Sequence, residues 1–155
     1  MATQARQRVI AIEEHYYDKE LAATFQGLDG RTGGKLRERL EEVGAQRLRE
    51  MDEAGVDVQV LSHGAPATQK LDAKSAASVS RSVNDRLGAL VKAHPDRFAA
   101  FAALPTADPK AAADELSRTV NELGFKGTMI HGAHGRRTFH RRRAVLADLR
   151  AGAGA

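Results

Sequence analysis

Carboxylate and imidazole side chains directly follow a short apolar run near the amino end of the chain. Residues 8–12 are Arg-Val-Ile-Ala-Ile, and Glu13, Glu14 and His15 come next. A short β-branched run of this kind predicts a buried strand with functional groups at its carboxyl end. Alternate side chains of a strand share a face, so we expect Glu13 and His15 on one face and Glu14 on the other. Such a pair suits a divalent metal such as zinc, although solvated residues at a strand end show the same pattern.

Other histidines lie where strands are expected to end. His63 precedes Gly64 after a second apolar run, a position typical of a hydrogen-bonded loop residue. His131 and His134 are three residues apart in a Gly/His segment, which fits either a substrate-binding loop or a solvated one. The chain has neither a Gly-rich phosphate loop nor a Gly-x-Ser-x-Gly nucleophile motif, so phosphate binding and serine hydrolysis are not indicated.

Regular elements that would position these groups alternate along the chain. Helical spacing of apolar residues, with Asp or Pro at the start and Gly or Pro at the end, predicts helices over residues 35–54, 72–93 and 109–123. Asp108 is the expected N-cap of the last helix, and Gly55 and Gly124 are expected stops. Four glycines within residues 21–34 predict an irregular loop. Short apolar runs predict strands over residues 8–12, 56–61, 98–104 and 125–130.

This alternation of strand and helix predicts an α/β fold with parallel strands joined by right-handed crossovers. Doubly wound sheets and (β/α)₈ barrels are both built this way, and both bind ligands at the carboxyl ends of their strands. A full barrel needs about 250 residues. The 155 residues here, with about four strands and three helices expected, would supply only about half of such a barrel, and both architectures stay open at this point.

Composition and charge narrow the classes of protein. The chain has no cysteine, which excludes disulfides, thiolate metal sites and a cysteine nucleophile. Its net charge is +4, and residues 141–155 carry most of it, so we expect no nucleic-acid partner for the body of the chain. No apolar run is long enough to span a membrane, so no membrane partner is expected. These features together predict a cytoplasmic protein.

A set of short segments occurs in a characteristic order. They are Val9-Ile10-Ala11-Ile12-Glu13-Glu14-His15, Met51-Asp52-Glu53-Ala54-Gly55-Val56-Asp57-Val58-Gln59-Val60-Leu61-Ser62, Ala65-Pro66 with Gln69, Asn84-Asp85, His94-Pro95-Asp96-Arg97-Phe98-Ala99-Ala100-Phe101-Ala102-Ala103-Leu104-Pro105 and Leu123-Gly124-Phe125-Lys126-Gly127. Over residues 8–140 the chain resembles the amidohydrolase-related decarboxylases, which include γ-resorcylate, 2,3-dihydroxybenzoate and aminocarboxymuconate-semialdehyde decarboxylases.

The resemblance implies an α/β fold in which this chain is the truncated N-terminal half, about four βα units, of a (β/α)₈ TIM barrel. It also implies one divalent metal, zinc or manganese, at the mouth of the barrel. It implies Glu13 and His15 as metal ligands, and a small aromatic or unsaturated carboxylic acid as the substrate of a non-oxidative carboxy-lyase. Hydrolases and hydratases share the fold, so the type of reaction stays open. His131 and His134 are the candidate substrate contacts. Their segment, His131-Gly132-Ala133-His134-Gly135, departs from the Asn-Gly-His that relatives often have at this place.

The last residues differ in character from the rest. We expect residues 1–140 to be a partial barrel domain and residues 141–155 an aberrant Arg/Ala/Gly tail. The tail is either a basic helix with a small-residue end, or the product of a reading-frame shift after His140. The Arg-rich tail also permits binding to an acidic partner. The family's later metal ligands and catalytic histidine would fall beyond residue 155, so no catalytic residue is expected in this chain.

Two functions remain open at the level of sequence. The first is a truncated metal-dependent decarboxylase of the amidohydrolase type that is inactive as this fragment. The second is a non-enzymatic α/β half-barrel that binds a partner or associates with itself as a homo-oligomer. Metal content separates them, because only the enzyme needs the metal.

Overall fold

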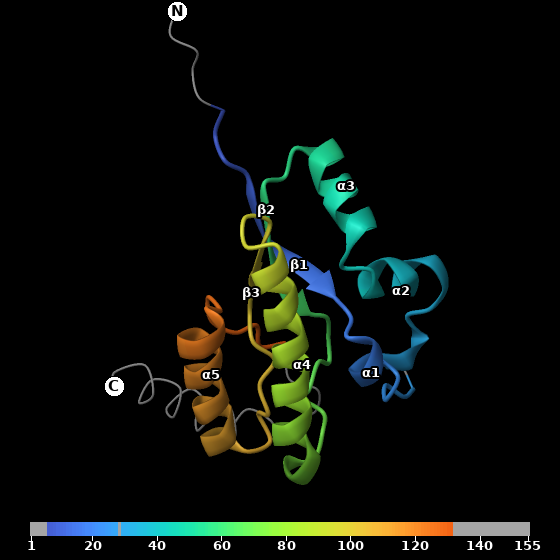
Figure 1. The fold of residues 1–155 in the computed structure, drawn as a ribbon. Coiled ribbons are helices and arrows are strands. Elements are labelled where there is room, and N and C mark those ends of the chain that lie inside the picture. The colour runs from blue at the N-terminus through green and yellow to red at the C-terminus, as the bar shows by residue number, and fades with distance from the viewer. Residues whose placement is uncertain (1–5, 28, 132–155) are drawn as a thin grey trace, which may run out of the picture.

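A small parallel sheet with helices against one face organises the chain (Figure 1). The computed structural model describes residues 6–27 and 29–131. The elements are β1 (Ile10–Tyr16), α1 (Lys19–Ala22), a 3₁₀ turn (Asp29–Arg31), α2 (Gly34–Glu41), α3 (Ala45–Ala54), β2 (Val58–His63), α4 (Ala73–Ala93), β3 (Phe98–Ala100) and α5 (Pro109–Leu123).

The strands are parallel and lie in the order β1-β2-β3. Tyr16, Leu61 and Phe98 on the three strands meet side chains of α3, α4 and α5 in one hydrophobic core, so the helices cover the same face of the sheet. Helices α4 and α5 lie side by side on it (Figure 1). The expected α/β class with parallel βα units is confirmed.

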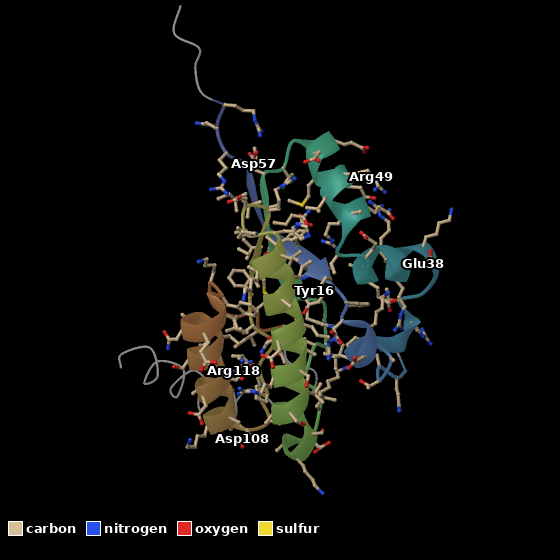
Figure 2. The ribbon with its side chains drawn as sticks, in the orientation of Figure 1. Tyr16, Glu38, Arg49, Asp57, Asp108 and Arg118 are labelled. Carbon is tan, nitrogen blue, oxygen red and sulfur yellow. The ribbon has the colours of Figure 1, made fainter. Side chains whose placement is uncertain are left out.

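Helix starts and stops follow the predicted capping residues. Asp72 accepts hydrogen bonds from the main-chain N–H groups of Lys74 and Ser75 at the start of α4. Asp108 caps α5 in the same way, directly before Pro109 (Figure 2). Gly55 and Gly124 end α3 and α5 with φ of 68° and 70°, a left-handed conformation that glycine adopts without steric cost.

The prediction of one helix over residues 35–54 is wrong. The chain forms two helices, α2 and α3, separated at residues 42–44. The Glu42 carboxylate accepts hydrogen bonds from the N–H groups of Gly44 and Arg47 at 3.0 and 2.9 Å. It therefore satisfies donors of the first turn of α3 that have no partner within that helix, and stabilises the break.

The first strand differs from its prediction in extent and burial. The strand continues to Tyr16, so Glu13, Glu14 and His15 are part of the strand and do not follow its end. Ile10 and Ile12, expected to be buried, are 53% and 61% exposed. Among the described residues β1 pairs only with β2, so one edge of this strand and part of its surface stay open.

The other strands also depart from their predicted limits. The third regular strand covers only residues 98–100 of the predicted 98–104. Instead of a fourth strand over residues 125–130, a single parallel bridge joins Thr128 to Ala102. The segment does run along the continuation of β3, since Ala102 N–H donates to the Gly127 carbonyl at 2.8 Å. Gly127 has φ of 138°, which is outside the strand region and interrupts the ladder.

No helix in the described part of the chain is long and apolar enough to cross a membrane.

Candidate functional site

Glu13 and His15 are both exposed residues in the carboxyl-terminal half of β1. Ala11 pairs with Gln59 and Glu14 pairs with Leu61, so β1 holds one extra residue between these pairs, which is a β-bulge. Regular pairing resumes at Glu14, and His15 lies opposite Ser62. Glu14 lines a cavity of about 460 Å³ between the sheet and helices α2 and α3.

The imidazole of His15 has two neighbours from distant parts of the chain. Its Nδ1 lies 2.9 Å from the hydroxyl oxygen of Ser62 on β2. The ring of His131 approaches it edge-on, with 5.9 Å between ring centroids and 63° between ring planes. The parallel sheet therefore brings together His15 and His131, two histidines that the sequence pattern singled out separately.

Both the ring and the main chain of His131 are held by hydrogen bonds. Its Nε2–H donates to the carbonyl oxygen of His63 at 2.8 Å. The side-chain amide of Gln69, oriented to satisfy both groups, donates to the His131 carbonyl at 3.3 Å and accepts from its N–H at 3.0 Å. His134, the other predicted substrate contact, lies outside the described residues.

His63 is a structural residue that is hydrogen-bonded as expected, although it is the last residue of β2 and not part of a loop. It is buried, its Nε2 accepts from the N–H of Asp18 at 3.0 Å, and its Nδ1–H donates to the Gly64 carbonyl at 2.8 Å. Burial lowers its pKa from 6.5 to about 4, and the hydrogen bond to Gly64 and the charge of Asp18 only partly oppose this shift. The ring is neutral near pH 7 and links the ends of β1 and β2.

Asp18 ties this end of the sheet to α4. Its buried carboxylate accepts two hydrogen bonds from Arg86, at 2.6 and 2.8 Å, and one from the N–H of Leu21 at 3.0 Å. Burial alone would raise the pKa of Asp18, but the hydrogen bonds from Arg86 and Leu21 outweigh it and lower the pKa. The pair spans 68 residues of sequence, and no local pattern pointed to it.

Arg47 supports the main chain of the candidate site from the helix side. Its guanidinium donates to the carbonyl of His15 at 3.0 Å, to the side chain of Gln59 at 3.2 Å and to the carbonyl of Glu42 at 3.1 Å. Sequence reasoning assigned no role to Arg47 or to Ser62. Ser62 becomes visible only when the register of β1 against β2 is known.

The donor types at the end of β1 fit a divalent metal, but their number is small. A carboxylate and an imidazole are ligands that zinc and manganese accept. The Nδ1 of His15 has a hydrogen-bond partner, as is usual for a histidine that binds metal through its other nitrogen. Within residues 6–27 and 29–131, however, no three His, Asp or Glu side chains form a group that could hold a metal. The described residues supply at most a partial centre.

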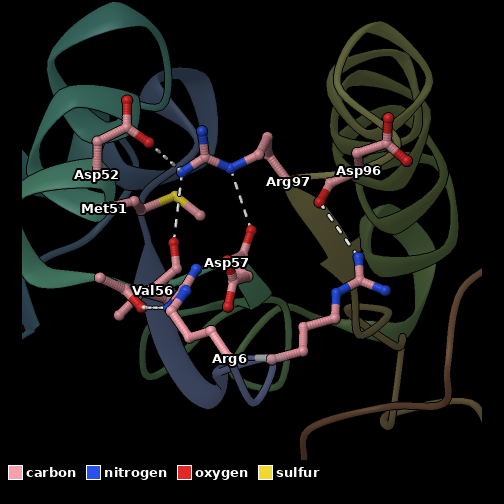
Figure 3. Close-up of a pocket in the computed structure, with 9 residues that line it drawn as sticks. Arg6, Met51, Asp52, Val56, Asp57, Asp96 and Arg97 are labelled. Carbon is pink, nitrogen blue, oxygen red and sulfur yellow. Dashed lines mark hydrogen bonds and ion pairs between the residues drawn. The ribbon is translucent and has the colours of Figure 1, made fainter. Parts of the chain in front are cut away.

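A second hollow lies at the opposite end of the sheet (Figure 3). It has a volume of about 370 Å³, and its lining includes Asp52, Asp57 and Arg97. Arg97 pairs with Asp52 at 2.8 Å and donates to the carbonyl of Asp57 at 3.1 Å, and Arg6 pairs with the Asp57 carboxylate. These charges are used in contacts that join the N-terminal segment to the strand starts. Ligands of parallel sheets bind at the other end, so we assign this hollow a structural role.

Parallel βα units with polar side chains at the carboxyl ends of their strands occur in both doubly wound sheets and (β/α)₈ barrels, two classes of α/β protein. The amidohydrolase family model matches residues 10–151. The chain belongs to the amidohydrolase family.

Its relatives act on aromatic acids. The γ-resorcylate decarboxylase of Rhizobium radiobacter is 42% identical over 125 residues, which are 79% of this chain and 38% of that protein. The 2,6-dihydroxybenzoate decarboxylase from Rhizobium superposes with a TM-score of 0.77 at 32% identity, over 95% of this chain and 48% of that one. The dihydroxybenzoic acid decarboxylase from Polaromonas sp. JS666, solved with bound manganese and the inhibitor 2-nitroresorcinol, gives 0.73 at 35% identity, over 92% and 47%.

The chain thus spans about two fifths of the length of the curated relatives it matches, and about half of the solved structures. Its parallel βα units are part of a (β/α)₈ barrel, as expected from the sequence.

Proposed function

We propose that this chain contributes the first part of the metal site of a non-oxidative aromatic-acid decarboxylase. The observation that carries the proposal is the pair Glu13 and His15 at the carboxyl end of β1, with His15 hydrogen-bonded to Ser62. Its relatives are decarboxylases of hydroxylated benzoates, and one of them carries manganese. The metal is manganese or zinc, and the substrate is a small aromatic or unsaturated carboxylic acid.

In this proposal the residues of the chain have separate tasks. Glu13 and His15 hold the metal, which when bound supplies positive charge for orienting the substrate's carboxylate and its neighbouring hydroxyl. His131, beside His15, lies on the substrate side of the site, and His134 is the second proposed substrate contact. The cytoplasmic location remains a prediction that cell fractionation would test.

Metal titration with matched variants tests the proposal. We expect Mn²⁺ or Zn²⁺ to bind the purified chain weakly, because two protein ligands are fewer than the roughly three of a catalytic zinc site. Glu13→Gln and His15→Ala should each weaken binding by tenfold or more, on the order of 1.4 kcal/mol. Glu14→Gln and His94→Ala are the controls, because they remove the same chemical groups elsewhere. Equal binding by all variants would reject the site.

The same samples test catalysis. With 2,6-dihydroxybenzoate and Mn²⁺ we expect little or no release of carbon dioxide from the chain assayed alone, since the described residues form no three-ligand centre. Turnover well above that of the His15→Ala variant would contradict this expectation.

A second candidate function is a self-associating half-barrel without catalysis. It is favoured by Ile10 and Ile12, which are 53% and 61% exposed on a strand that pairs on one side only within the described residues. Open edges with apolar side chains promote association. Light scattering over a range of concentrations should show oligomers that Ile12→Lys disperses, whereas Leu36→Lys, at an equally exposed apolar position on α2, should not. A monomer at every concentration would reject this candidate.

A further inference from the structure

Ser62 and His15 face each other across the β1–β2 ladder. They are register partners, and the hydroxyl oxygen of Ser62 lies 2.9 Å from Nδ1 of His15. Their surroundings differ, because Ser62 is fully buried whereas the His15 side chain is exposed. A buried hydroxyl therefore lies within hydrogen-bond distance of one nitrogen of an imidazole that is otherwise exposed.

A neutral imidazole carries one proton, and the nitrogen that lacks it is the one able to bind a metal. A partner that accepts a hydrogen bond at Nδ1 keeps the proton there and leaves the lone pair on Nε2. We propose that Ser62 is a positioning residue for His15. Its hydroxyl oxygen accepts the Nδ1–H and sets both the tautomer and the direction of the ring, so that Nε2 faces the metal position.

The other contacts of His15 are consistent with this role. The ring of His131 packs edge-on against it, with 5.9 Å between ring centroids, and so limits its rotation. Arg47 binds the carbonyl of His15 and so holds the main chain, not the ring. In the proposal it is the hydrogen bond from Nδ1–H to the Ser62 hydroxyl oxygen that selects between the two nitrogens. The inference rests on the proposed metal site for its purpose, but the contact can be tested without metal.

The first experiment records the tautomer of His15 by ¹⁵N NMR in the metal-free chain at about pH 8, where an ordinary imidazole is neutral. The Nδ1–H form should predominate in the parent chain, and Ser62→Ala should remove that preference. Ser62→Thr, which keeps a hydroxyl, should retain it. The control is Ser80→Ala, because Ser80 is equally buried but bonds Thr68 away from the site. An Nε2–H form in the parent chain, or no response to Ser62→Ala, would overturn the proposal.

The second experiment measures the affinity for Mn²⁺ by calorimetry. Ser62→Ala should weaken binding by about tenfold or more, a usual effect of removing the partner of a ligating histidine, and Ser62→Thr and Ser80→Ala should not. Circular dichroism checks that each variant folds. If the parent chain binds no metal but the tautomer responds to Ser62→Ala, the positioning contact stands and the proposed metal site fails. If Ser62→Ala and the parent bind equally well, the positioning role is rejected.

Discussion

Histidines of this chain differ in role because their surroundings differ. His63 and His15 occupy neighbouring strands, yet His63 is buried with both ring nitrogens bonded to main-chain groups, whereas His15 is exposed with one nitrogen bonded to Ser62. The first arrangement leaves no ring nitrogen for chemistry, and in the second the contact with Ser62 involves Nδ1 and not Nε2. The position of His63 before Gly64 predicted a hydrogen-bonded residue, but its burial and its bond to the N–H of Asp18 arise only in the assembled sheet.

The buried neutral state of His63 predicts how stability depends on pH. Its pKa is about 4 in the folded chain against 6.5 for an ordinary histidine, so the unfolded chain binds more protons between these values. The free energy of unfolding should therefore fall as the pH falls from about 6.5 to about 4, by up to about 3 kcal/mol. Below that window His63 contributes no further loss.

Urea unfolding of the parent chain and of His63→Gln at several pH values measures this effect. The variant should be less stable at pH 7 and should lose less stability across the window. Parallel pH profiles for the two proteins would show that His63 is not the group responsible.

The hydroxyl of Tyr16 is a buried polar group without a hydrogen-bond partner among the described residues. Burial raises the pKa of its phenol, and the nearby Asp18 carboxylate raises it further. Tyr16→Phe removes this hydroxyl but keeps the aromatic ring, so the variant avoids the cost of burying an unpaired polar group. Tyr16→Phe should unfold with an equal free energy, or one up to about 1 kcal/mol higher, in denaturant titrations. A loss of more than 1 kcal/mol would mean that the hydroxyl has a partner, such as a bound water.

At the scale of elements, local patterns located most helix ends but not the breaks and bulges. Asp72, Asp108, Gly55 and Gly124 act through their own backbone neighbours, so their effect is visible in sequence. The break between α2 and α3 depends on the Glu42 carboxylate, which caps the start of α3. The helical spacing of apolar residues continues across this break, so the sequence pattern did not reveal it. The bulge in β1 and the short contact at Thr128 depend on pairing with other strands, which a single run of residues does not encode.

The packing of α4 against α5 predicts a large effect for one buried amide. Asn84 accepts from the N–H of Ala103 at 2.9 Å and donates to the carbonyl of Ala103 at 2.9 Å and to Glu115 at 2.8 Å. Asn84→Ala leaves these buried groups unpaired, so the free energy of unfolding should fall by about 2–4 kcal/mol. Asn121→Ala, on the exposed side of α5, should change it by less than about 0.5 kcal/mol. Similar values for the two variants would contradict the assigned network.

At the scale of the whole molecule, the sheet has one face covered by helices and one open strand edge within the described residues. Composition and alternation predicted the α/β class, and the resemblance predicted the family that the comparisons then confirmed. The candidate metal site could be predicted only as the pair Glu13 and His15. Its partners Ser62 and His131 come from 47 and more residues away, so they emerge from the assembled sheet.

The position at which manganese binds is the most direct test of this account. Mn²⁺ is paramagnetic and broadens the NMR signals of nuclei near its binding site. Small additions to the ¹⁵N-labelled chain should first broaden the signals of Glu13, His15 and Ser62, and leave those of Asp52 and Asp57 at the opposite end of the sheet unchanged. Broadening centred on Asp52 and Asp57, or spread evenly over the chain, would contradict the proposal that the end of β1 is a metal site.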